Sequence, residues 1–336
     1  MTNISVSPHV RSGLSTSTVM RDVAIALMPA LLFGTFIFGL RALIIIALCA
    51  ITCVLTEFVY QKLMKLPVTV ADGSALVTGL ILAMNMPSTV PFWMPVMGSV
   101  FAILFVKQLF GGIGQNFMNP ALAARCFLLI SFPAMMGGSW PAVGNVFGAN
   151  MLDGFVQRMT TLTVDAASTA TPLAVLQSGG EIDLLQAFLG AHSGCIGETS
   201  TLAILIGALY MIARGVISPR IPTVYVASAV ACAFLLNLAA GNGVMPINYL
   251  VGQVVSGGLF AGAVFMATDY VSSPITRVGQ WIYAILLGFL TALFRVFGSS
   301  AEGVSYAIII GNTLVPLIER VTIPRAFGQT RKGGAA

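Results

Sequence analysis

Ten apolar runs, separated by polar segments, set the strongest limit on what this chain can fold into. Five of them lie before residue 134, at about 23–40, 42–60, 74–86, 92–106 and 117–132. Five more follow residue 198, at about 202–213, 223–240, 250–268, 281–294 and 305–318. A helix needs about 20 apolar residues to cross a bilayer alone, so the shorter runs must be tilted, broken or shielded by protein. The pattern predicts an all-α integral membrane protein with about ten transmembrane helices.

The low charge supports this interpretation. Only 8% of the 336 residues are charged and 57% are hydrophobic, a balance that a soluble fold of this length could not solvate. The basic residues behind the net charge of +5 are scattered beside the apolar runs, so we predict no nucleic-acid partner. The first 20 residues lack the apolar core and cleavage site of a signal peptide, so we expect a retained amino terminus.

The basic residues also predict an orientation in the cytoplasmic membrane. With both termini in the cytoplasm, only Arg41, Arg158 and Arg295 fall on the outer side, as the tendency of Lys and Arg to stay inside predicts. Twelve others fall on the cytoplasmic side: Arg11, Arg21, Lys62, Lys65, Lys107, Arg214, Arg220, Arg277, Arg320, Arg325, Arg331 and Lys332. The same parity places the polar, acidic segment 134–198 outside the cytoplasm.

That polar segment divides the chain into two membrane halves, 23–133 and 199–320, flanked by cytoplasmic segments at 1–22 and 321–336. Five spans in each half mean that the halves enter the membrane from opposite faces, which predicts an inverted repeat. The stretch GLILAMNMPSTVP at 79–91 is similar in spacing and character to GAVFMATDYVSSP at 262–274. Inverted repeats with interrupted helices usually place a site near the midplane, between the halves.

Four acidic residues are candidates for an ion path, namely Glu57, Asp72, Asp269 and Glu302. Asp72 opens the short third run, where it either caps a helix or lines a polar cavity. The other three lie at membrane depth or at span ends, where each either serves a cation path or faces the headgroups. The sequence leaves these alternatives open.

The stretch GGIGQNFMNPALAARC at 111–126 precedes and enters the fifth run. Gly112 and Gly114 permit turns and a close approach of a ligand to the backbone. The stretch follows an apolar helix rather than a strand, which excludes a dinucleotide site. Asn116 and Asn119 either bind a polar ring or cap a helix. Arg125 lies inside an apolar run, where an ionisable group marks a functional site, a buried ion pair or a bond to helix-end carbonyls.

The cysteines and histidines predict neither a metal site nor a hydrolase. Cys49, Cys53, Cys126, Cys195 and Cys232 contain no C-x-x-C pair, and four of them lie in apolar runs, as small buried residues do. Cys49 and Cys53 share a helix face, but no histidine is near them in the sequence. His9 and His192 are the two histidines, and the predicted topology puts them on opposite faces of the membrane. No Ser-His-Asp arrangement is supported.

Four motifs carry a resemblance that covers nearly the whole chain: SPHVR at 7–11, DGSALVTG at 72–79, the 111–126 stretch, and DAASTATP at 165–172. With them the chain resembles the D subunits of the Rnf complex, an ion-translocating ferredoxin:NAD oxidoreductase. It resembles more distantly the B subunit of the sodium-pumping NADH:quinone reductase, whose extended amino-terminal region is missing here. The resemblance implies two inverted five-helix halves similar to urea and ammonium transporters.

The resemblance also implies a covalent cofactor. In that family a flavin transferase joins FMN through its phosphate to a threonine within a pattern like Asp-x-x-Ser/Thr-Gly-Ala-Thr. Asp165, Ser168, Ala170 and Thr171 match this pattern, whereas Thr169 stands in the place of glycine and is a rival acceptor. Thr171 is therefore expected to carry FMN, and relatives suggest a second, noncovalent riboflavin. The candidate flavin environment comprises Gly112, Gly114, Asn116, Asn119 and Arg125, whose charge could stabilise a reduced, anionic flavin.

The expected function is that of a membrane protein that passes electrons through FMN while its complex moves Na⁺ or H⁺. Such a subunit is not catalytic alone. Its expected partners are the A, B, C, E and G subunits of the complex, the flavin transferase and membrane lipid. The alternatives are a small-solute transporter, which an inverted repeat alone would equally suggest, a B-type quinone reductase subunit, and a scaffold for neighbouring redox subunits. Flavin on the purified chain would separate electron carriage from transport and scaffolding.

Overall fold

The computed structural model describes residues 15–138, 140–141, 143, 151–161, 166–167, 171–240, 246–298 and 303–324. Five helices in these ranges are long and apolar enough to cross a membrane. They are α1 (Thr16–Phe38), α2 (Leu40–Leu63), α11 (Arg220–Ala239), α14 (Arg277–Phe297) and α15 (Val304–Thr322). The predicted all-helical, multi-pass membrane protein is confirmed at this level. A two-residue antiparallel pair of β1 (Trp140–Pro141) and β2 (Ala166–Ala167) is the exception among the described residues.

The other apolar runs form shorter or interrupted helices. Three are single short helices: α3 (Ser74–Met84), α5 (Pro120–Ser131) and α10 (Thr201–Ala213). Two are composite: α4 (Trp93–Phe101) continues into the π-helix η2 (Ala102–Gln108), and α12 (Ile247–Val255) precedes α13 (Leu259–Ala261) and the π-helix η3 (Gly262–Met266). Each of the ten predicted runs thus coincides with one helix or one composite helix. That all ten cross the membrane stays a prediction.

The break between α12 and α13 follows from two adjacent glycines. Gly257 and Gly258 have φ angles of 69° and 67°, in the left-handed region that side chains disfavour. Ser256 before them is extended, which ends α12. The two helical pieces consequently meet at an angle of 53°. This break leaves backbone carbonyls in the protein interior that need partners.

Polar caps define where several helices begin. The Ser15 hydroxyl accepts a hydrogen bond from the Thr18 backbone N–H at 3.2 Å, so α1 begins at Thr16 rather than at residue 23, where its apolar run begins. Asn119 caps α5, with Pro120 in the first helical position, where its missing N–H costs nothing. Ser200 caps α10 in the same way as Ser15. Ser15 and Ser200 lie outside the apolar runs, which is why hydropathy alone misses them.

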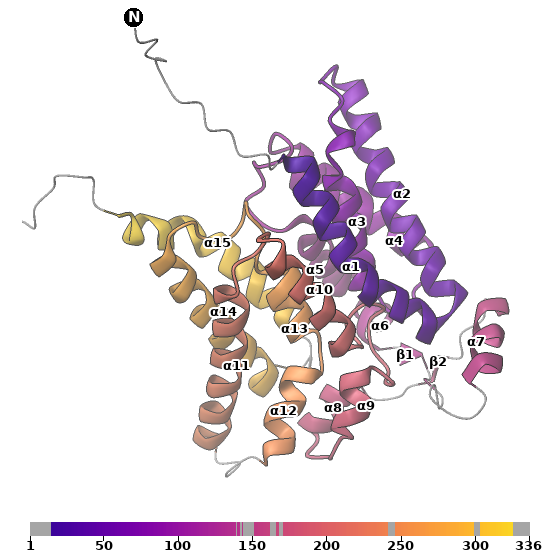
Figure 1. The fold of residues 1–336 in the computed structure, drawn as a ribbon, viewed down its shortest axis with the longest axis vertical. Helices are drawn as coiled ribbons and strands as arrows, with labels where there is room; N and C mark the ends of the chain where they lie inside the picture. Colours follow the sequence, from indigo (N-terminus) through magenta and orange to yellow (C-terminus); the bar gives the residue numbers. More distant parts are fainter. Residues whose placement is uncertain are drawn as a thin grey trace, which may run out of the picture.

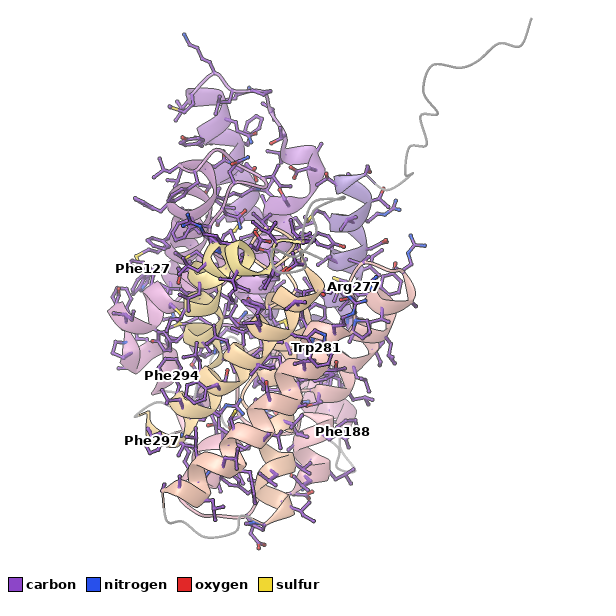
Figure 2. All side chains as sticks on the ribbon, turned by 90° about the vertical axis from the view of Figure 1, so that its left-hand side faces the viewer. Phe127, Phe188, Arg277, Trp281, Phe294 and Phe297 are labelled. Atoms are coloured by element: carbon purple, nitrogen blue, oxygen red, sulfur yellow. The ribbon has the colours of Figure 1, made fainter. Side chains whose placement is uncertain are left out.

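The helices pack into one bundle, with the polar segment at one end (Figure 1). Helix α1 packs along α10, α2 along α3 and α4, and α14 along both α11 and α15. The start of α1 lies in the upper part of Figure 1, α8 (Pro172–Gln177) and α9 (Leu184–Leu189) lie in the lower part, and α7 (Met151–Thr160) lies at the right-hand edge. In Figure 2, Arg277 lies above Phe294 and Phe297 on α14, which fixes the direction of that helix. The remaining short elements are η1 (Val70–Asp72) and α6 (Pro133–Gly137).

Helices of the bundle approach most closely at glycines, as is usual in membrane interfaces. A Cβ atom on Gly207 of α10 would lie 2.2 Å from the backbone oxygen of Ala26 in α1. We therefore expect Gly207→Ala to lower the free energy of unfolding by about 1–3 kcal/mol, since α1 and α10 would have to separate. Thermal unfolding of the protein in detergent would measure this. Gly137→Ala, where nothing lies within 4 Å, is the matched control, and equal losses in both variants would contradict the prediction.

Candidate functional site

Thr171, the expected cofactor attachment residue, is half-buried at the start of α8. Its Oγ1 accepts a hydrogen bond from the Ala174 backbone N–H at 3.3 Å and so caps this helix. Pro172 occupies the first helical position. The hydroxyl therefore has a fixed direction and retains its own proton for other chemistry. Asp165, Ser168, Thr169 and Ala170 lie outside the described residues.

The helix that follows Thr171 is anchored to the broken helix. Leu173 and Leu176 are buried, and they lie against Gly257 and Gly252 respectively. The side-chain amide of Gln177 donates to the backbone oxygen of Arg295 at 2.7 Å. Through these contacts Thr171 is held at a constant position relative to the break between α12 and α13.

Arg295, near the end of α14, satisfies the carbonyls that this break exposes. Its guanidinium donates to the backbone oxygens of Gln253 at 2.6 Å, Ser256 at 3.2 Å and Gly257 at 3.0 Å. A cation at the end of α12 also interacts favourably with the dipole of that helix. This arginine is one of the three that charge counting assigns to the outer side. Arg41, another of them, likewise donates to three backbone oxygens at residues 88–90.

His192 lies in the loop between α9 and α10, outside the membrane-spanning helices. Its Nδ1 is 3.0 Å from the Ser193 oxygen and its Nε2 is 3.1 Å from the Thr199 oxygen. Burial lowers the pKa of His192, although the facing carbonyl oxygens act in the opposite direction. The folded state therefore keeps a neutral imidazole at pH values where the unfolded chain already takes up a proton.

The sign of the pH dependence follows. Because the folded pKa of His192 lies below its unfolded value of about 6.5, its contribution to stability is complete above that pH and is lost as the pH falls. We expect the melting temperature to fall between pH values of about 7.5 and 5.5, and to fall less in His192→Gln. The matched control is His9→Gln, which should keep the wild-type slope. Parallel slopes for wild type and His192→Gln would contradict the assignment.

Arg125 lies in a buried cluster that joins the first half of the chain to the end of the polar segment; we call Arg125, Glu198 and Asn85 the Arg125 cluster. Arg125 is 3% exposed and pairs with the Glu198 carboxylate at 2.5 Å. It also donates to the side-chain oxygen of Asn85 at the end of α3. The backbone around Glu198 is held in place as well, since Ile196 and Gly197 donate to backbone oxygens of the α3 end, each at 2.9 Å. Of the three alternatives for Arg125, the structure contains the buried ion pair.

A second buried cluster brings two of the ion-path candidates together; we call Glu57, Lys107, Ser74 and Asp72 the Glu57 cluster. The Lys107 ammonium is 2.8 Å from Glu57 Oε2 and 2.7 Å from Ser74 Oγ. Ser74 in turn donates to Asp72 at 2.6 Å, and Asp72 also accepts from the Ser74 backbone N–H at 2.8 Å, although Gly73 occupies the N-cap position of α3. Gln108 donates to Glu57 at 2.8 Å. The four side chains thus form one hydrogen-bonded chain.

Asp269, the third candidate, lies just after η3, beside the 111–126 stretch. Ser272 donates to its carboxylate at 2.8 Å, and the Asn116 side chain lies against it. Asn119 caps α5 and also donates to the Met266 backbone oxygen at 3.4 Å. These asparagines therefore serve as structural partners between the two halves. A cavity of about 70 Å³ adjoins Asn119 and Asp269.

The glycines of the 111–126 stretch are needed for its backbone. Gly111, Gly112 and Gly114 have φ angles of 114°, 93° and 84°. A Cβ atom on Gly114 would meet nothing within 4 Å, so conformation rather than space requires glycine there. The predicted role in permitting turns is confirmed. Glu302, the fourth ion-path candidate, and the SPHVR motif with His9 lie outside the described residues.

Three partners in these clusters are not predicted by the sequence pattern. Charge counting assigns Lys107 to the cytoplasmic side, but η2 continues to Gln108 and the lysine is 3% exposed. Glu198 groups with the solvated acids of the polar segment, yet it is 6% exposed. In the sequence, Asn85 is notable only as part of the stretch at 79–91, which is similar to the stretch at 262–274. One signal in the sequence could have indicated these partners. A charged residue within an apolar run needs a partner of opposite charge, because burying an unpaired charge costs too much free energy.

Comparison with known proteins finds similarity along nearly the whole chain. A family model described as the NQR2, RnfD, RnfE family matches residues 3–328. The chain is 47% identical to the D subunit of the Na⁺-translocating ferredoxin:NAD⁺ oxidoreductase complex of Acetobacterium woodii, covering 98% of this chain and 96% of that protein. It is 38% identical to the D subunit of the proton-translocating ferredoxin:NAD⁺ oxidoreductase complex of Clostridium ljungdahlii, again covering 98% and 96%. The D subunit of the ion-translocating oxidoreductase complex of Stutzerimonas stutzeri is also 38% identical, covering 95% and 94%. Because the family model and these relatives cover nearly the whole chain, the protein belongs to the NQR2, RnfD, RnfE family.

Proposed function

We propose that this chain is the D-type membrane subunit of an ion-translocating ferredoxin:NAD⁺ oxidoreductase and passes electrons through FMN esterified to Thr171. The names of its full-length relatives support the first part. The second part rests on the position of Thr171. Its hydroxyl has a fixed direction at the start of α8, and α8 is anchored to the broken helix. The other subunits of the complex are its proposed partners, and it is not catalytic alone.

The residues around Thr171 fit the attachment of a phosphoester. Its Oγ1 would become the ester oxygen and would still have a lone pair with which to cap α8. Leu173 and Leu176 would hold the tether point against α12. Asp165, Ser168 and Ala170 are the proposed recognition residues for the flavin transferase. When bound, FMN supplies the electron-transfer chemistry, and the protein supplies its position and electrostatic surroundings.

The proposed surroundings of a second flavin do not fit one as they stand. The cavity beside Asn119 and Asp269 measures about 70 Å³, below the roughly 300–1,000 Å³ of usual ligand pockets. Arg125 is buried in its ion pair, and both asparagines already hold backbone groups. We therefore derive no role for riboflavin at this cavity.

Within the membrane we propose ten crossings in two inverted halves, with both termini in the cytoplasm and the polar segment outside. Corresponding helices make corresponding contacts: α2 packs on α3 and α4, and α11 on η3, α12 and α14. Each half also has a buried cation late in its fourth helix, Lys107 in one and Arg295 in the other. Both cations reach toward the third helical unit of their half, at Ser74 and Gly257. This correspondence supports the repeat.

The ion path is proposed at one buried acid, Glu57, and two half-buried acids, Asp72 and Asp269, of the described bundle. Glu57 and Asp72 belong to one hydrogen-bonded cluster, and Asp269 lies between the halves. Glu302 remains a sequence-based candidate. Of two relatives that are similar over nearly their whole length, one is named as Na⁺-translocating and the other as proton-translocating, so both ions are proposed.

The test of the proposed function is the covalent flavin itself. We expect Thr171→Ala, expressed with the flavin transferase, to abolish the fluorescence of this subunit on a denaturing gel, since no hydroxyl remains to form the ester. Thr171→Ser keeps a hydroxyl and Thr169→Ala removes only the rival acceptor, so both should remain fluorescent. Unchanged fluorescence in Thr171→Ala, or its loss in Thr169→Ala, would contradict the assignment. Intact mass of the subunit provides the same comparison without fluorescence.

One observation favours a second candidate, a small-solute transporter. The α12–α13 pair is bent by 53° at mid-span, and broken helices of this kind line substrate sites in transporters with inverted repeats. Saturable solute uptake by purified protein that contains no flavin would favour this candidate. A flavin signal that disappears with Thr171 would favour electron transfer.

A further inference from the structure

An apolar groove of about 570 Å³ lies on the outer surface of the bundle, between α2 and η2. One wall consists of Leu55, Val59 and Leu63 on one face of α2, and the other of Leu104, Phe105 and Leu109. Four of these side chains are at least half exposed: Leu55, Leu63, Phe105 and Leu109. The groove lies apart from Thr171 and from the two buried clusters.

One wall of the groove belongs to the π-helix η2. Its hydrogen bonds skip one residue more than in an α-helix, and such insertions often mark functional sites. Lys107 and Gln108 turn inward to Glu57, while Phe105 and Leu109 remain on the outside. The winding that buries the lysine therefore also shapes the outer groove.

The dimensions of the groove match one leaflet of a bilayer. From Leu55 to Leu63 it extends along α2 for about 12 Å, at about 1.5 Å per residue. Half of a hydrocarbon core of about 30 Å is about 15 Å. At the Leu63 end, α2 stops, and the exposed residues Lys62 and Lys65 lie there. Phe58 supports the Lys62 ammonium, which lies 4.9 Å from the centre of its ring.

The charge at that end is positive. The acid of α2 near these lysines, Glu57, is buried and paired with Lys107, so it does not neutralise them. An apolar groove gives little preference among lipids, since any acyl chain finds equivalent surroundings in the bilayer. Exposed lysines at the membrane surface favour anionic lipids over neutral ones, because they attract anionic headgroups. We propose that this groove binds the acyl chain of an anionic phospholipid whose phosphate lies beside Lys62 and Lys65.

The experiment uses the whole complex, purified in mild detergent from membranes that contain phosphatidylglycerol and phosphatidylethanolamine. Native mass spectrometry would measure which phospholipid stays on this subunit. Wild type should retain phosphatidylglycerol in excess over its share of the membrane. Lys62→Gln with Lys65→Gln should lower that excess by ~25-fold, at about fivefold for each lysine. Leu55→Trp, which fills the groove, should lower the retention of both lipids.

Two variants on α14 are matched controls: Arg277→Gln removes an exposed basic residue, and Ile285→Trp enlarges an exposed apolar one. Neither should alter the retained lipid. Three results would overturn the proposal. They are retention of lipids in the proportions of the membrane, retention of an uncharged lipid regardless of the lysines, and wild-type lipid retention in Leu55→Trp. A photoreactive side chain in place of Val59 provides a second measurement that needs no loss of binding. Linkage to phospholipid supports the proposal, and linkage to a neighbouring protein of the complex refutes it.

Discussion

Replacing Lys107 by methionine is expected to lower the free energy of unfolding by about 3–5 kcal/mol, because it leaves the Glu57 carboxylate buried without its cation. Glu57 is 1% exposed and would retain only the amide donors of Gln61 and Gln108. Thermal unfolding of the protein in detergent would measure the loss. Lys62→Met, which removes an exposed lysine from α2, should stay within about 0.5 kcal/mol of wild type.

The double variant separates charge from packing. Glu57→Gln with Lys107→Met has no buried charge, and neutral side chains of similar size often replace such pairs at little cost. We expect it to be more stable than Lys107→Met alone, although it contains one substitution more. If the double variant is the less stable of the two, the ion pair does not account for the loss.

Replacing Arg125 by methionine is expected to have an effect of similar size, about 3–5 kcal/mol, at the Arg125 cluster. The change leaves Glu198, which is 6% exposed, beside Gly258 without a cation, and it removes the donor to Asn85. Because this cluster joins α5 to the loop before α10, the variant should also loosen the contact between the first half and that loop. Hydrogen exchange at residues 195–198 would detect this as faster exchange.

Arg214→Met is the matched control for Arg125. It breaks another arginine–carboxylate pair, with Asp22 at 3.2 Å, but the Arg214 side chain is 49% exposed. Water reaches this guanidinium, and Asp22, whose own side chain is 4% exposed, would keep the Tyr210 hydroxyl as a donor at 3.2 Å. We therefore expect a smaller loss, of roughly 1–3 kcal/mol. Equal losses in the two arginine variants would show that burial does not determine the cost.

Much of the bundle could be predicted because hydropathy depends on local composition. Each apolar run forms a helix, and Gly257 and Gly258 interrupt the run at 250–268, as glycines in mid-span can. Boundaries are harder, since Ser15 fixes the start of α1 from outside its apolar run. The π-helical winding of η2 could not be predicted, because it depends on the partner that Lys107 finds in α2.

The candidate sites were predictable as residues but not as clusters. Arg125 and Glu57 were identifiable because a charge among apolar neighbours needs a reason. Their partners Glu198 and Lys107 lie 73 and 50 positions away along the chain, beyond the reach of any local pattern. Thr171 was identified by resemblance to a family, and its capping role and its link to α12 come from the fold.

The separation between Arg125 and Glu198 has a consequence for biosynthesis. The two residues are 73 positions apart, so a ribosome that adds about 5–20 residues per second makes the carboxylate about 4–15 s after the arginine. During that interval the first half has its arginine at membrane depth without the acid that pairs with it in the finished fold. The nascent first half must therefore remain in a hydrated or assisted setting until the polar segment has been translated, which couples its completion to the arrival of that segment.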